Sequence, residues 1–309
     1  YHTMETCVTF TWMQLCNRLL QMTGNSLYAD YMETAIYNAL MASLKADASQ
    51  IAKYSPLEGW RHEGEEQCGM HINCCNANGP RAFAMIPQFA YQVQDDCVRV
   101  NFYAPSEAEL VLPSKKPVRL KQTTDYPRTD QIEIEVDPAK ETTFTIALRI
   151  PAWSKIAVVS VNGQPQDGVL QGAYLPVNRK WKKGDRITVK LDLRARLVER
   201  NQAQAIVRGP VVLARDSRFG DGFVDEASVV VSKDGYVELT PVKTPGFAWL
   251  AFTAPMVLGT DLESNRAPKQ IHFCDFASAG NTWDKTQRYR VWLPKTLNVM
   301  HSPYRPYNQ

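Results

Sequence analysis

The chain has 309 residues, of which 44% are hydrophobic and 22% are charged, and its formal net charge is +3. This composition is typical of a globular protein of roughly two domains and excludes the collagen-like and disordered classes. The near balance of charge disfavours a nucleic-acid surface, and no apolar run approaches the ~20 residues of a membrane span. The sequence therefore predicts a folded protein with no nucleic-acid partner and no membrane span. Small neutral ligands are the more plausible partners, and the oligomeric state stays open.

The cysteines are unevenly distributed along the chain. Five of the seven fall within the first 75 residues, and their odd number argues against a framework of paired disulfides. This clustering favours a thiolate site. The first residue is Tyr1 and no signal peptide follows it, so we expect the chain to begin inside a longer protein. The cysteines are Cys7, Cys16, Cys68, Cys74, Cys75, Cys97 and Cys274.

Helical spacing dominates the N-terminal part of the sequence. Apolar residues recur over 8–22 with a period near 3.6, and Gly24 follows as a stop signal. A second apolar stripe predicts a helix that extends to about Lys45, with Asn25 and Ser26 available as caps. The two segments together predict a helical hairpin.

A third helix is predicted after a polar loop over 47–69. The run H-I-N-C-C-N-A-N-G-P occupies 71–80, and Pro80 is well suited to the first position of a helix. Pro87 is expected to kink or interrupt that helix. The candidate caps are Asn76 and Asn78.

After Asp95 the period of the apolar residues changes to about 2, which is typical of strands. Turn signals such as Asn162-Gly163 separate these segments at short intervals, without helices between them. Short strands joined in this way predict an antiparallel β-sandwich. The clearest strand segments are 98–102, 132–136, 143–150, 158–161, 187–193 and 211–214.

The residues with the sharpest chemistry are Glu5 and Cys7 together with the adjacent pair Cys74 and Cys75. Three thiolates and one carboxylate are a suitable tetrahedral set for Zn²⁺. Adjacent cysteines reach one metal less easily than a C-x₂₋₄-C pair does. Two other interpretations therefore stay open: Cys7 as a small core residue, and a strained disulfide between Cys74 and Cys75.

The motifs E-T-C at 5–7, Y-S-P-L-E at 54–58 and N-C-C-N-A-N-G-P-R at 73–81 resemble glycoside hydrolase family 127, the β-L-arabinofuranosidases. Motifs of the β half agree, and they also resemble the related family 146. The resemblance extends to about Arg215. The β motifs are L-R-I-P-A-W at 148–153, V-N-G at 161–163, R-K-W-K-K-G-D at 179–185 and R-G-P-V-V-L-A-R at 208–215.

The resemblance implies a mixed α and β multidomain fold, with the C-terminal part of an (α/α)₆ barrel followed by antiparallel β-sandwich domains. Residues 1–95 would be the end of the barrel and 96–215 a β-sandwich. Residues 216–309 would be a further β-rich region, belonging to a second sandwich.

The resemblance also implies a set of site residues. Glu5, Cys7, Cys74 and Cys75 would bind Zn²⁺, and Cys74 would also be the nucleophile of a retaining glycosidase. Tyr54 approximately matches a sugar-contacting Tyr of the family. His71 is a candidate for sugar binding because it lies three residues before Cys74, while metal ligation and a purely structural histidine stay open as alternatives. The expected substrate is a β-L-arabinofuranoside or a related plant-glycan sugar.

The sequence departs from the family pattern at one catalytic position. The family's general acid/base is a Glu on the N-terminal side of the E-x-C motif, where this sequence has four residues, none of them acidic. We therefore expect that residue upstream of Tyr1. The alternative is a non-catalytic carbohydrate-binding or structural β-sandwich module with a structural zinc-thiolate site. The compartment stays open between the bacterial periplasm and cytoplasm.

Overall fold

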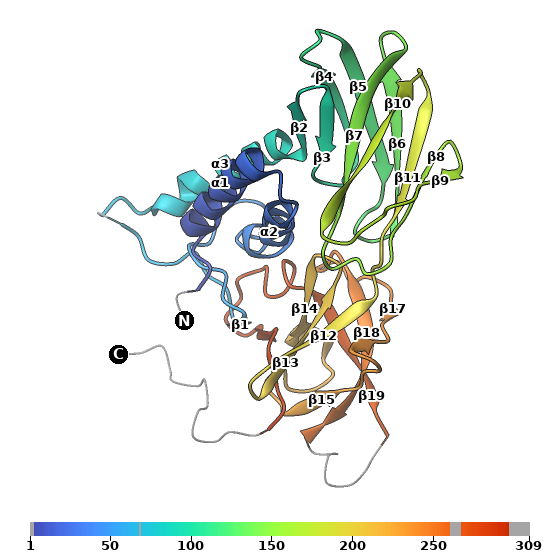
Figure 1. The fold of residues 1–309 in the computed structure, drawn as a ribbon. Coiled ribbons are helices and arrows are strands. Elements are labelled where there is room, and N and C mark those ends of the chain that lie inside the picture. The colour runs from blue at the N-terminus through green and yellow to red at the C-terminus, as the bar shows by residue number, and fades with distance from the viewer. Residues whose placement is uncertain (1–2, 68, 260–266, 297–309) are drawn as a thin grey trace.

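The computed structural model describes residues 3–67, 69–259 and 267–296, in which helices lie beside two groups of strands (Figure 1). Helices α1 (Thr6–Thr23), α2 (Leu27–Ala35) and α3 (Cys74–Ala90) form the helical part, and α2 continues into a π-helical turn, η1 (Ile36–Leu40). In these ranges no helix is long and apolar enough to cross a membrane. The fold is thus mixed, with sheet as its larger part. Cys68 and the residues after 296 lie outside the described ranges.

Helix α1 confirms the first predicted helix. Its buried apolar residues include Phe10, Met13, Cys16 and Leu20, which recur at helical spacing and share one core with α2 and α3. Gly24 ends the helix at φ 67°, and its N–H donates to the Leu20 carbonyl. Glycine suits this left-handed cap because it has no Cβ.

The start of the second helix differs from the prediction. Ser26 makes no side-chain cap, because its hydroxyl donates instead to the Gly172 carbonyl at 2.6 Å. The Asn25 side chain accepts a hydrogen bond from the Leu27 N–H at 3.0 Å, as a residue that caps this end would do.

Helix α3 begins six residues before the predicted start at Pro80. Asn73 is its cap: Oδ1 accepts from the Cys75 N–H at 3.0 Å, while Asn76 Oδ1 accepts from the Asn73 N–H at 2.8 Å. This reciprocal capping box starts the helix at Cys74, so the prediction from Pro80 was wrong. The helix also continues through Pro87, which does not interrupt it.

The first β unit consists of two sheets that enclose one core. One sheet has the order β10-β7-β3-β2 and the other β4-β5-β6-β11-β8-β9, and both contribute to the same cluster of buried residues. The strands β3 and β7 pair in parallel, in contrast to the expected purely antiparallel arrangement. The bounds are β2 (Tyr91–Gln94), β3 (Cys97–Val100), β4 (Ser106–Val111), β5 (Pro117–Thr124), β6 (Gln131–Pro138), β7 (Thr142–Ile150), β8 (Val158–Val161), β9 (Gln164–Pro165), β10 (Ala173–Trp181) and β11 (Asp185–Lys190).

The second β unit contains the later strands, with the main path β15-β18-β19-β14-β13-β12-β16. Strands β12 to β14 pair here, although the expected boundary at 215/216 grouped them with the first unit. The bounds are β12 (Ala195–Arg200), β13 (Ala203–Arg208), β14 (Val211–Asp216), η2 (Ser217–Phe219), β15 (Ser228–Val230), β16 (Tyr236–Val237), β17 (Thr240–Pro241), β18 (Ala251–Leu258), β19 (Lys269–Asp275), β20 (Tyr289–Arg290) and β21 (Leu293–Pro294).

Two buried arginines connect the parts of the fold. Arg149 of β7 forms ion pairs with Asp30 and with Glu33 of α2, the latter at 2.6 Å. Arg61 donates to the Ala277 carbonyl at 2.7 Å and its guanidinium lies 4.9 Å from the Tyr289 ring. Near it, β1 (Glu58–Gly59) pairs with β20. Helix α2 is therefore held against the first β unit, and the loop before α3 against the second.

Candidate metal centre

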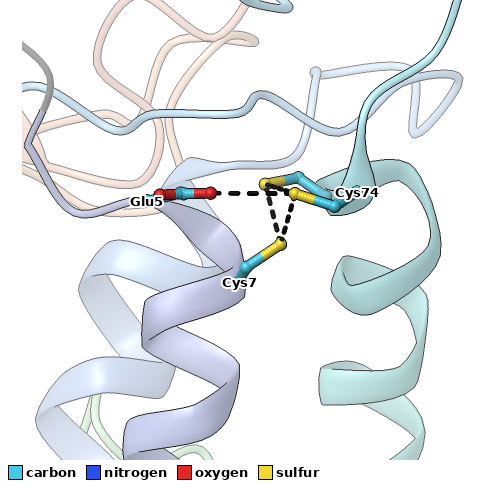
Figure 2. Close-up of side chains that lie close together, drawn as sticks. Glu5, Cys7 and Cys74 are labelled. Carbon is cyan, nitrogen blue, oxygen red and sulfur yellow. Dashed lines mark hydrogen bonds between the residues drawn. The ribbon is translucent and has the colours of Figure 1, made fainter. Parts of the chain in front are cut away.

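The four predicted ligands meet where helices α1 and α3 begin. Glu5, Cys7, Cys74 and Cys75 each offer one ligand atom, and these atoms all lie within 4.8 Å of one another. Figure 2 shows the side chains of Glu5, Cys7 and Cys74 pointing toward one another from the two helix ends. The Cys7 Sγ lies 2.9 Å from the Cys74 Sγ and 3.3 Å from the Cys75 Sγ. The Glu5 Oε1 is 3.7 Å from the Cys74 Sγ.

The backbone around the cluster fixes both helix ends. The Thr6 N–H donates to the Lys53 carbonyl at 2.9 Å, which ties the start of α1 to the loop before α3. The Cys74 N–H donates to Gln67 Oε1 at 2.8 Å. Both helices thus direct their N-terminal ends toward the thiols, and the positive end of a helix dipole favours a thiolate there.

The geometry distinguishes between the interpretations left open by the sequence. The Cys74 and Cys75 sulfurs are 4.0 Å apart, far from the ~2.05 Å of a disulfide bond, and both thiols are free. Cys7 is half-buried and faces the other ligand atoms, so it is not a simple core residue. A tetrahedral zinc with Zn–S bonds of ~2.3 Å separates its sulfurs by about 3.8 Å, and the observed separations bracket that value.

The donor set fits a soft divalent cation. Three sulfurs and one carboxylate oxygen are ligands that Zn²⁺ accepts. Burial raises the pKa of the Cys75 thiol, and a hydrogen bond with the Cys7 sulfur, followed by burial, raises the pKa of the Cys74 thiol. A bound cation reverses this effect, because it stabilises the thiolate form. The residues present therefore fit a metal ion, which would displace the thiol protons and bind the sulfurs as thiolates.

Asn78 contributes to the site in a way that the sequence analysis did not predict. Its Nδ2 donates to the Cys7 Sγ at 3.2 Å, and its Oδ1 accepts from Arg81 Nη1 at 3.2 Å. From the sequence, Asn78 was expected only as a candidate helix cap. Its position four residues after Cys74 places it on the same face of the helix, one turn away, which would have indicated that it lies near the cluster.

The two predicted sugar contacts differ in their relation to the cluster. Tyr54 forms a backbone bridge with Glu5, and its half-buried ring lies 5.4 Å from Lys53 Nζ. The His71 side chain is 92% exposed and pairs with Glu66, Nδ1 to Oε2, at 2.9 Å. The structure thus brings Tyr54 beside the cluster and leaves His71 outside the group of ligand atoms.

An apolar groove of about 310 Å³ adjoins the cluster along α1. Cys7 lies at its end, and Val8, Trp12 and Leu15 line it together with Thr11. The Val8 side chain is 61% exposed and the Leu15 side chain 48%. The cluster therefore opens onto an exposed apolar face of the helix.

Comparison with known proteins gives a consistent assignment. The sequence model described as β-L-arabinofuranosidase, GH127 catalytic domain, matches residues 1–88, and that of the GH127 middle domain matches 97–193. A non-reducing end β-L-arabinofuranosidase of Bifidobacterium longum subsp. longum is 26% identical over 235 residues, 67% of this chain. The two domain models together match more than half of the chain. The chain belongs to glycoside hydrolase family 127.

Solved structures show the same fold. A GH127 β-L-arabinofuranosidase from Geobacillus stearothermophilus T6 aligns with a TM-score of 0.78, 22% identity and 94% coverage of this chain. A second GH127 β-arabinofuranosidase aligns with a TM-score of 0.80 at 24% identity and 96% coverage. The chain spans 49% and 50% of those two structures and 34% of the Bifidobacterium protein.

Proposed function

We propose that this chain is part of a retaining glycoside hydrolase that uses a zinc-bound cysteine nucleophile. The observation that carries the proposal is the convergence of Glu5, Cys7, Cys74 and Cys75 within 4.8 Å in a member of family 127. The proposed substrate is a β-L-arabinofuranoside or a related plant-glycan sugar, in line with the activity named for the Bifidobacterium relative. No other described group of three or more potential ligands forms such a cluster.

Each residue of the cluster has a separate task in this proposal. Glu5, Cys7, Cys74 and Cys75 hold Zn²⁺, which supplies positive charge that keeps the sulfurs ionised near neutral pH. Cys74 is the nucleophile, because its half-buried sulfur is more accessible than the buried Cys75 sulfur. Its thiolate attacks the anomeric carbon, and the C–O bond to the leaving group breaks. A water then attacks the same carbon and releases Cys74, so the configuration is retained.

The proton for the leaving oxygen must come from another group. Glu5 is engaged with Cys74 in the cluster, at 3.7 Å, and is assigned to the metal. We place the general acid/base Glu upstream of Tyr1 in the longer protein. Tyr54 and His71 are proposed to contact the sugar, Tyr54 from its place beside Glu5 and His71 by a rearrangement away from Glu66.

A stripe of exposed apolar side chains supports the larger architecture that we propose. Val8, Trp12, Leu15 and Met22 lie along one face of α1 and are 41–81% exposed. Such a stripe on a helix is normally covered by another element. We propose that further helices of a longer protein cover it and complete an (α/α)₆ barrel, with residues 1–95 as the barrel's end.

The nucleophile is tested by trapping, which does not need the acid/base residue. An aryl β-L-arabinofuranoside with a strongly acidic phenol as leaving group needs no proton donor, so zinc-loaded chain should acquire the mass of one pentosyl unit on Cys74. The Cys74→Ser variant should acquire none. The matched control is Cys97→Ser, which removes a half-buried free thiol of β3, and it should label like the parent chain. Labelling that persists in Cys74→Ser would contradict the proposal.

The second candidate function is a carbohydrate-binding or structural module with a structural zinc-thiolate site. The cluster joins the ends of α1 and α3, as a structural metal would. In that case zinc raises the melting temperature, but no pentosyl adduct forms on any cysteine. Extension of the chain upstream would then add no hydrolysis of the aryl glycoside.

A further inference from the structure

A cavity of about 650 Å³ lies between the two β units, away from the cysteine cluster. Arg128 and Ile156 of the first unit and Arg208, the last residue of β13, are among the residues that line it. Cavities between folded units are common places for small-molecule sites, and this volume is in the usual range of about 300–1,000 Å³. The proposed glycosidase chemistry makes no use of this cavity.

Two of the four cations around the cavity are neutralised by neighbouring carboxylates. The Lys190 Nζ lies 3.7 Å from Asp130 Oδ2. The Arg194 guanidinium binds Asp192 in a bidentate way, with Nε to Oδ1 at 2.8 Å and Nη2 to Oδ2 at 2.6 Å. These four residues therefore contribute little net charge to the cavity.

The two remaining cations have no such partner. Within the described part of the chain, neither Arg128 nor Arg208 has a carboxylate oxygen within 4.0 Å of its guanidinium. Their hydrogen bonds go to neutral carbonyls instead. Arg208 donates from Nη1 to Pro127 at 2.6 Å and from Nη2 to Arg128 at 3.1 Å, and Arg128 Nη2 donates to Trp249 at 3.1 Å. The cavity thus carries an excess of two positive charges.

Arg208 is the less exposed of these two cations. One face of its guanidinium lies 5.2 Å from the Phe252 ring centroid, and burial lowers the pKa of Arg208. Arg208 is half-buried and has no carboxylate of the described residues in contact, so an anion that entered the cavity would offset the cost of its partial desolvation. Guanidinium groups bind carboxylates well because their N–H groups match the two oxygens.

Another wall of the cavity is apolar. Ile156 and Val158 are 62% and 55% exposed and both line the cavity, so they offer it an apolar surface. The C–H face of a sugar ring can pack against such a surface, while Thr129 and Asp130 offer a hydroxyl and a carboxylate group for its hydroxyls. An inorganic anion would leave this wall and most of the volume unused.

We propose that this cavity binds a uronic-acid unit of an acidic oligosaccharide, with its carboxylate between Arg128 and Arg208 and its ring on Ile156 and Val158. The site is an accessory binding site, independent of the metal cluster. It recognises a hexuronate by charge and a pyranose ring by contact, so a neutral sugar of the same shape binds much more weakly.

The direct test follows the Ile156 δ-methyl group of the full 309-residue chain by NMR, with its signal assigned by the Ile156→Val variant. Digalacturonate is the probe, and neutral α-1,4-galactobiose is its matched counterpart. The expected result is a saturable shift of the Ile156 signal with digalacturonate and an affinity at least ~10-fold weaker for galactobiose. Equal binding of both sugars, or no shift with digalacturonate, would overturn the proposal.

Two variants locate the carboxylate. Arg128→Gln should weaken digalacturonate binding about fivefold or more, because it removes one charged partner at the rim of the cavity. The matched control is Arg186→Gln, an exposed arginine of β11 that pairs with Glu133 and lies outside the cavity lining. It should bind like the parent chain. If Arg128→Gln also binds like the parent chain, the assignment is wrong.

Inorganic sulfate distinguishes a sugar site from a simple anion site. Sulfate should compete with digalacturonate only weakly, since it makes no contact with the apolar wall. Competition by sulfate at equal concentration would show that the cavity holds anions without selecting a sugar, and would overturn the proposal. The Cys74→Ser, Cys75→Ser double variant should keep the digalacturonate shift, so failure of the metal site is distinguishable from failure of this one.

Discussion

The Sγ atoms of Cys7 and Cys74 lie 2.9 Å apart, although 67 residues separate the two cysteines in the sequence. The contact exists because α1 and α3 begin side by side and both direct their first residues toward the same point (Figure 2). Residue 7 is the second residue of α1 and residue 74 the first of α3. Changes at these two helix ends should therefore act on metal binding first.

Removal of the Asn78 amide should weaken zinc binding. Asn78 Nδ2 donates to the Cys7 sulfur at 3.2 Å and stabilises its charge, so Asn78→Ala should lower zinc affinity about tenfold, as loss of a group behind a ligand commonly does. Competition with a chelator of known affinity measures the change. The control is Asn178→Ala, which removes an exposed Asn that donates to Thr145 in the sandwich. If both variants bind zinc equally, the Asn78 contact has no influence on the site.

Helix α3 packs so closely at Gly79 that a methyl group cannot be added without displacement. A Cβ there would lie 2.7 Å from Cγ2 of Ile51, and Ile51 is buried. Gly79→Ala should therefore reduce the free energy of unfolding by about 1–3 kcal/mol, which outweighs the gain of up to ~1 kcal/mol in helix propensity. Urea unfolding measures it. Gly246→Ala is the control, because its Cβ would meet nothing within 4 Å.

The buried ion pairs of Arg149 should be important for stability. Arg149→Met leaves Asp30 and Glu33 buried without their cation, and we expect a loss of about 3–5 kcal/mol in the free energy of unfolding at neutral pH. The control Arg186→Met breaks the pair of an exposed arginine with Glu133 and should cost less than ~1 kcal/mol. Losses of equal size in the two variants would contradict this account.

The loss of stability in Arg149→Met should depend on pH in a defined direction. Burial raises the pKa of Glu33 above its unfolded value, so between the two values the folded protein binds the proton more tightly and stability falls as pH rises. Loss of the Arg149 charge raises the pKa of Glu33 further, which widens this window. The destabilisation by Arg149→Met should hence be smaller at about pH 5 than at about pH 8. Urea unfolding at both pH values checks it, and a larger loss at the lower pH would contradict it.

The regular elements were predictable where local chemistry determined them. The apolar period and Gly24 predicted α1, and alternation predicted the strand at 158–161 with the bounds that β8 has. Alternation also predicted the strand over 143–150, whose neighbours β3 and β10 lie far away in the sequence. Strand pairing depends on such distant contacts, which is why the parallel pairing of β3 with β7 was not predicted.

The start of α3 shows why the site itself was only partly predictable. Proline at position 80 favours a first helical position, but the capping box of Asn73 and Asn76 starts the helix earlier and places Cys74 and Cys75 at its N-terminal end. The residue types at 5, 7, 74 and 75 indicated a metal site. The hydrogen bond from Asn78 to Cys7 depends on the packing of α1 against α3, which no local pattern encodes.

The exposure of His71 could not be predicted from the sequence either. Its backbone has φ 56°, and its ring pairs with Glu66 rather than with any atom of the cluster. Sequence proximity to Cys74 suggested a shared site, but a left-handed turn between the loop and the helix directs the side chain elsewhere. The role of His71 in sugar binding stays a prediction.

If the Glu5, Cys7, Cys74 and Cys75 cluster is a zinc-thiolate site, the purified chain should contain zinc. Elemental analysis should find about one zinc per chain after exhaustive dialysis, and close to none in the Cys74→Ser, Cys75→Ser double variant. The Cys97→Ser variant should retain the full amount. A chain without zinc, or a double variant that keeps it, would contradict the account.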